Sequence, residues 1–137
     1  MAMVELKLDE ARMDRLEEVL ALLDSVLEGV GCPLKTQMQM DVAVEELYVN
    51  IAHYAYAPAT GPAIVRVDVE DGATVTVTFI DQGMPYDPLA KPDPDVTLSA
   101  EKRQIGGLGI YIAKKTMDDM VYRREGDSNV LTIRKRL

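Results

Sequence analysis

The chain contains 137 residues, of which 47% are apolar, and it carries a formal net charge of −8. This length corresponds to one domain, and the apolar content excludes an intrinsically disordered chain. The negative charge disfavours general binding to nucleic acids or anionic membranes, and the basic stretch Arg134-Lys135-Arg136 is most simply an exposed strand end.

The first thirty residues predict a strand followed by a helix. Residues 4–8 alternate apolar and polar side chains, as a strand with one buried face does. Asp9 is expected to cap the helix, whose apolar stripe is formed by Leu16, Val19, Leu20, Leu23 and Leu27. Residues 1–14 are too charged for a signal peptide, and no apolar run approaches the ~20 residues of a membrane helix.

A second helix is predicted from about residue 34 to residue 56. The break at residues 29–33 precedes it, and Pro58 limits its end. Cys32, the only cysteine of the sequence, lies in that break. It cannot form a disulfide within the chain, which fits the reducing environment of the cytoplasm.

The second helix carries the first candidate site residues. Glu46, Asn50 and His53 fall on one helical face between two apolar stripes, where polar groups are partly desolvated. Glu46 is a candidate general base with a pKa raised by burial, and Asn50 offers an oxygen ligand to Mg²⁺. An ordinary helix surface is the alternative, since this spacing is common. His53 by itself is more typical of a structural residue.

Two strands are predicted next, at residues 63–69 and 74–80. The segment between them contains Asp71-Gly72, which favours a hairpin. Asp81 follows the second strand, where its carboxylate can accept a hydrogen bond from an amine such as that of adenine. Gly83 would let a flat ligand approach the backbone. A capping aspartate in a turn is the alternative.

Residues 81–105 lack periodicity and are too long for a passive connection, so we expect a lid or binding loop rather than a floppy insertion. Gly106, Gly107 and Gly109 open a third predicted helix, at residues 108–117. The free N–H groups and dipole of a helix start favour phosphates, and Lys102 and Arg103 lie just upstream. The glycine pattern matches neither the Walker nor the Rossmann motif.

Residues 120–124 and 129–135 predict a closing hairpin that turns at residues 126–128. The predicted order is therefore βααββ, loop, αββ. It indicates a single α+β domain, a two-layer α/β sandwich with a mostly antiparallel mixed sheet covered on one face by three helices.

Three motifs, taken in order, resemble the ATPase/kinase superfamily of gyrase, histidine kinases and heat-shock chaperones, with its Bergerat ATP-binding fold. Residues 43–53 (AVEELYVNIAH) are similar to the N box of that superfamily. Residues 81–88 (DQGMPYDP) and 106–110 (GGLGI) are similar to its two glycine boxes. The likeness is greatest to the small branch of anti-sigma-factor serine kinases, and it covers nearly the whole chain.

The resemblance implies a role for each matching residue. Glu46 would be the base, Asn50 the Mg²⁺ ligand and Asp81 the partner of adenine. Gly83 would admit the base, and the glycines of the second box would form the phosphate cradle and the hinge of an ATP lid at about residues 84–105. Further implied contacts to the nucleotide are His53, Met84, Arg103, Gly106, Gly107, Leu108, Gly109 and Thr132.

The implied activity is transfer of the ATP γ-phosphate to a serine or threonine of an anti-sigma-antagonist protein. The resemblance also implies sequestration of a sigma factor, often by a homodimer, with no direct contact to nucleic acid or membrane. A nucleotide-gated binding module without useful catalysis is the second hypothesis. An α/β domain with no nucleotide site is the third.

Overall fold

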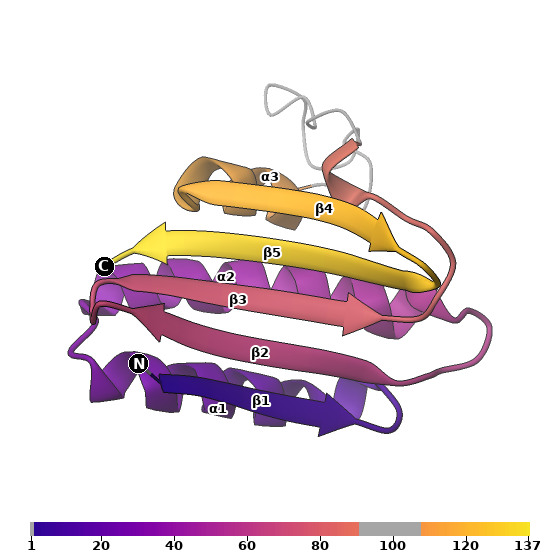
Figure 1. The fold of residues 1–137 in the computed structure, drawn as a ribbon, viewed down its shortest axis with the longest axis horizontal. Coiled ribbons are helices and arrows are strands. Elements are labelled where there is room, and N and C mark those ends of the chain that lie inside the picture. The colour runs from indigo at the N-terminus through magenta and orange to yellow at the C-terminus, as the bar shows by residue number, and fades with distance from the viewer. Residues whose placement is uncertain (1, 91–107) are drawn as a thin grey trace.

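A computed structural model describes residues 2–90 and 108–137, which form two layers, a five-stranded sheet and a layer of helices on one of its faces (Figure 1). The strands are β1 (Ala2–Leu8), β2 (Ala63–Glu70), β3 (Thr74–Asp81), β4 (Asp119–Glu125) and β5 (Ser128–Arg136). They are ordered β1-β2-β3-β5-β4, and every pairing in the described part of the chain is antiparallel. The expected sandwich is confirmed, whereas the strands of residues 2–90 and 108–137 form a purely antiparallel sheet and not a mixed one.

The helical layer is formed by α1 (Leu16–Gly29), α2 (Leu34–Asn50) and α3 (Leu108–Thr116). The chain continues from α2 into a π-helical turn, Ile51–Ala55, and short 3₁₀ turns occur at Met13–Arg15 and Pro88–Ala90. Within the described residues, no helix has both the length and the apolarity required to cross a bilayer.

The sheet follows from the alternation in the sequence. Val65 and Val67 on β2, and Val77 and Phe79 on β3, are buried against the helices. The turn between these strands places both Asp71 and Gly72 at positive φ, 55° and 66°. Two successive residues with positive φ match the twist of a tight hairpin. The predicted hairpin is therefore confirmed.

The start of α1 differs from the prediction. Ala11 is buried, and its N–H donates to the carbonyl of Gly61 at 2.7 Å. The chain remains extended as far as Arg12, whose φ and ψ are −97° and 160°. Asp9 therefore lies outside the helix and does not cap it, because a contact with a segment fifty residues away holds the backbone extended.

Two carboxyl groups, Asp24 of α1 and Asp41 of α2, meet where the two helices pack together. One oxygen of each is buried without a hydrogen-bond partner from a side chain or the backbone. The pKa of Asp41 is raised to about 7, mainly by burial and also by the hydrogen bond and charge of Asp24 and by the charges of Glu45 and Glu28. The native protein therefore keeps a proton on this carboxyl group up to about pH 7, whereas the unfolded chain releases it near the ordinary aspartate pKa of 3.8.

This proton makes stability depend on pH. Between about pH 4 and pH 7 the native state binds more protons than the unfolded state, so the free energy of unfolding falls as pH rises through this window. We expect Asp41→Asn to flatten that slope and to raise the free energy of unfolding at about pH 8 by about 1 kcal/mol, a value discounted for partial solvation. Urea unfolding at several pH values measures it, with the exposed Asp127→Asn as control. If the free energy of unfolding changed with pH equally steeply in the parent and in Asp41→Asn, the proposed role of the Asp41 proton would be contradicted.

Candidate functional site

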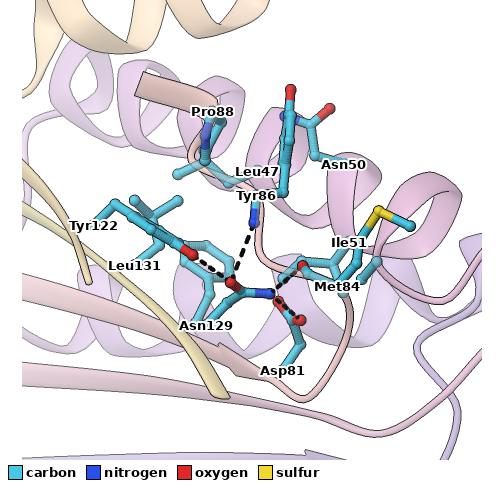
Figure 2. A pocket seen from close by; sticks show the side chains of 12 residues that line it. Leu47, Asn50, Ile51, Asp81, Met84, Tyr86, Pro88, Tyr122, Asn129 and Leu131 are labelled. Carbon is cyan, nitrogen blue, oxygen red and sulfur yellow. Dashed lines mark hydrogen bonds between the residues drawn. The ribbon is translucent and has the colours of Figure 1, made fainter. Parts of the chain in front are cut away.

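A pocket opens where the end of α2 approaches the end of β3 and the start of β5 (Figure 2). Apolar side chains form most of its wall, and three polar side chains, Asn50, Asp81 and Asn129, face it. The full lining is Leu47, Asn50, Ile51, Ala55, Phe79, Asp81, Met84, Tyr86, Pro88, Tyr122, Asn129 and Leu131.

Asp81 and Asn129 form the polar floor of this pocket, and each is only 6% exposed. Asp81 Oδ1 accepts a hydrogen bond from the N–H of Gly83 at 2.9 Å and another from the Asn129 side-chain amide at 2.9 Å. Both hydrogen bonds use the same oxygen, so within the described part of the chain Oδ2 is left to accept a hydrogen bond from a ligand. The carboxylate is thereby held in one orientation.

The Asn129 carboxamide is the centre of a small network (Figure 2). Its amide also donates to the carbonyl of Met84 at 2.9 Å, and its oxygen accepts from the Tyr122 hydroxyl and from the Tyr86 N–H. Strands β3, β4 and β5 and the segment after β3 therefore meet at one side chain. A buried amide with both ends paired costs little and fixes the groups around it.

Thr132 lies on the other face of the sheet, contrary to expectation. It pairs directly with Thr78, whereas Asn129 pairs with Asp81. Side chains alternate between faces along a strand, so residues 129 and 132 of β5 point in opposite directions. Asn129 thus occupies the pocket position that the sequence assigned to Thr132. Sequence reasoning missed it, although Asn129 continues the buried alternation of Leu131 and Ile133.

Asn50 also lines the pocket, and its side chain takes no part in the hydrogen bonds around Asn129 (Figure 2). It is the last residue of α2, and Ile51 and Ala55 of the π-helical turn continue the wall. A π-helical turn advances less per residue than an α-helix and is frequent at functional sites. His53 is exposed, with its ring edge-on to that of Tyr54, and does not line the pocket. The nucleotide contact implied for His53 is therefore not part of this pocket.

Gly83 packs against the end of the helical segment. A Cβ added there would lie 2.1 Å from the carbonyl oxygen of Ala55. The next residue, Met84, donates its N–H to that same oxygen at 3.0 Å, and Arg124 donates to the Gly83 carbonyl at 2.8 Å. The glycine is required by this backbone contact, whereas the sequence interpretation assigned it to ligand approach. Met84 itself is 56% exposed and borders the pocket.

Glu46 lies one turn before Asn50 and contacts the first turn of α3. A Cβ on Gly109 would fall 2.2 Å from the Glu46 carboxyl carbon, so any side chain at residue 109 would displace the carboxyl group from its present position. Burial, and to a lesser degree the charge of Glu45, raises the pKa of Glu46. Glu46 does not line the pocket of Asp81, but its carboxyl group lies beside the start of α3. Leu108, the first residue of α3, is exposed. Lys102, Arg103, Gly106 and Gly107 lie outside the described residues.

The pocket is narrow in this conformation. The volume open to water is about 30 Å³, which is enough for one or two water molecules. A purine ring would enter only after lining side chains, such as the 56% exposed Met84, had moved. The chemistry of the wall suits a purine, since apolar side chains can cover its faces and a fixed carboxylate can accept from its amine.

Comparison with known proteins yields consistent matches. A family model of the histidine kinase-like ATPase domain matches residues 10–135. The serine/threonine-protein kinase BtrW of Bordetella bronchiseptica is 25% identical over 99 residues, which are 72% of this chain and 70% of BtrW.

Two solved structures share the fold. The RsbU and RsbW domains of Rv1364c from Mycobacterium tuberculosis align with a TM-score of 0.71 at 17% identity, covering 100% of this chain and 33% of that one. The chain therefore spans a third of that structure. The SiaB-SiaC complex of Pseudomonas aeruginosa aligns with a TM-score of 0.57 at 17% identity, covering 96% of this chain and 89% of that one.

Proposed function

Because the chain belongs to the histidine kinase-like ATPase domain family, we propose that it binds ATP and transfers the γ-phosphate to a serine or threonine of a partner protein. One observation supports this most directly. Asn50 and the fixed carboxylate of Asp81 face one pocket, and Glu46, one helical turn away from Asn50, lies beside the start of α3.

The pocket suggests how ATP would lie. The free oxygen of Asp81 would accept from the adenine amine, and the apolar wall would cover the ring. The triphosphate would then extend past Asn50 toward the N-terminus of α3, where free N–H groups favour negative charge. Glu46, with its pKa raised, would accept the proton of the attacking hydroxyl.

Mg²⁺ fits the residues around Asn50. In residues 2–90 and 108–137 no group of three or more His, Cys, Asp or Glu could hold a metal ion. Mg²⁺ does not need such a group, because it takes few protein ligands and completes its shell with water and phosphate oxygens. Asn50 would supply the protein oxygen. The ion would neutralise charge on the phosphates during transfer.

The partner belongs to the proposal as well. BtrW is named a serine/threonine-protein kinase, and SiaB was solved in complex with SiaC. By analogy, we propose that this chain phosphorylates an anti-sigma-antagonist domain and sequesters a sigma factor or a similar regulator. The experiment is to incubate it with Mg²⁺, γ-labelled ATP and the antagonist domains encoded in its own genome. Label on a serine or threonine of one domain supports the proposal, and absence of label on all of them contradicts it.

The narrow pocket favours a second candidate, a nucleotide-gated binding module. If residues 84–88 must move to admit ATP, nucleotide binding would alter the surface beside β4 without any turnover. This candidate predicts heat from Mg-ATP titration and changed hydrogen exchange in residues 84–88, but no labelled product. The labelling experiment therefore separates the two functions.

The position of Asn129 in the pocket and of Thr132 on the other face of the sheet gives a prediction about ATP affinity. We expect Asn129→Ala to raise the Kd for Mg-ATP by about tenfold, because Asp81 loses the amide that orients it. Thr132→Val should change the Kd less than about twofold, since residue 132 lies on the far face of the sheet. Isothermal titration measures both. Equal losses for the two variants would contradict the assignment.

A further inference from the structure

The outer surface of the helical layer carries a groove lined by exposed apolar side chains. Leu34, Met38 and Val42 of α2 are 71%, 59% and 42% exposed, and Ile112 of α3 is 37% exposed. Together with Lys35 and Gln39 they line a shallow open groove. Four large apolar side chains exposed in one groove, on a protein of this charge, are typical of an interaction surface.

The groove leads toward the candidate base. Leu34, Met38 and Val42 are spaced four residues apart, and Glu46 is the next position of the same series. The two helices run in opposite directions, since Gly109 contacts Glu46 while Ile112 borders the groove with Met38 and Val42. Four residues advance about 6 Å along an α-helix, so Val42 lies about 6 Å and Met38 about 12 Å from Glu46 along α2.

We infer that this groove docks the phosphoacceptor protein, an inference that rests on the proposed kinase function. The acceptor hydroxyl must come within hydrogen-bond distance of Glu46 for its proton to be taken. A stable protein interface buries roughly 800 Å² on each partner, a patch that extends about 16 Å from its centre. An acceptor domain placed over Glu46 therefore covers the part of the groove formed by Val42, Met38 and Ile112, and these apolar side chains supply buried area.

Charge indicates the chemistry of the acceptor surface. Lys35 lines the groove, and Lys115 is exposed near the end of α3, with its ammonium 5.4 Å from the centre of the Tyr111 ring. Lys35 is thus a cation within the groove, and Lys115 lies one turn after the groove residue Ile112, on a chain whose net charge is −8. The matching surface on the acceptor carries apolar side chains flanked by Asp or Glu, a few residues from the phosphorylated serine or threonine.

The test uses neutral substitutions on the whole chain and the antagonist domains of the same genome. Met38→Gln/Ile112→Gln removes apolar surface from both helices without adding charge near Glu46. Met3→Gln is the matched control, since Met3 is 58% exposed on the opposite face of the sheet. We expect the double variant to raise KM for the acceptor about tenfold, with kcat and the Kd for Mg-ATP within about twofold of the parent. The control should match the parent.

Binding is measured in parallel with acceptors whose serine or threonine is replaced by alanine. If an acceptor domain binds but its unmodified form is not labelled, the kinase proposal is contradicted. Weaker binding of that domain by the double variant would still support the groove as the docking site. Label with an unchanged KM and unchanged binding for the double variant overturns the groove alone. Neither label nor binding by any domain overturns both.

Discussion

Glu46→Gln is expected to lower the rate of γ-phosphate transfer by at least about a hundredfold, with the Kd for Mg-ATP within about threefold of the parent. Glutamine has the same shape and fills the same place beside Gly109. Its amide cannot accept the proton of the attacking hydroxyl, and loss of a general base costs roughly 10²–10⁴ in rate. Single-turnover labelling of the acceptor measures the rate, and calorimetry measures the affinity.

Glu45→Gln is the matched control, because Glu45 is the neighbouring residue and is exposed. At about pH 8 it should transfer phosphate at the parent rate. Since the Glu45 charge helps to raise the pKa of Glu46, removing it should move the acid limb of the rate profile to lower pH. If the Glu46→Gln variant transferred phosphate at the parent rate, Glu46 would not be the general base.

The parts of the fold that depend on local sequence were predictable. Period-two alternation located β2 and β3, and Asp71-Gly72 supplied the two positive φ values of their turn. The start of α1 was not predictable, because it depends on a hydrogen bond between Ala11 and Gly61. The strand order was also not readable, since nothing local in β5 shows that it inserts between β3 and β4.

The site was predictable to the extent that a single element determines it. Asn50 and Asp81 each lie at the end of a clearly patterned element, and the structure brings them to one pocket. His53 does not share the pocket with Asn50, and the π-helical turn after Asn50 departs from the 3.6-residue period on which the common helical face was predicted. Thr132 was misplaced because motif matching ignored the face of the strand. Asn129 shows its role only when the register between β3 and β5 places it opposite Asp81.

Gly83→Ala distinguishes a glycine required by the fold from one required by the ligand. The new Cβ would lie 2.1 Å from the Ala55 carbonyl oxygen and 2.6 Å from its carbon, and both are backbone atoms that cannot rotate away. The strand end or the π-helical turn must therefore shift, and the hydrogen bond from Met84 to Ala55 weakens with it. We expect the free energy of unfolding to fall by about 3 kcal/mol and Tm by about 10 °C.

Gly29→Ala is the control, because a Cβ at that position, the last residue of α1, meets nothing within 4 Å. Its Tm should stay within about 2 °C of the parent. Thermal and urea unfolding without nucleotide measure the fold, and Mg-ATP titration below the lower Tm measures the ligand. If Gly83 is glycine because a ligand approaches the backbone there, Gly83→Ala should show the reverse pattern: an unchanged Tm together with a loss of ATP affinity. That result would mean that the Ala55 contact relaxes at little cost and that the close approach belongs to the nucleotide.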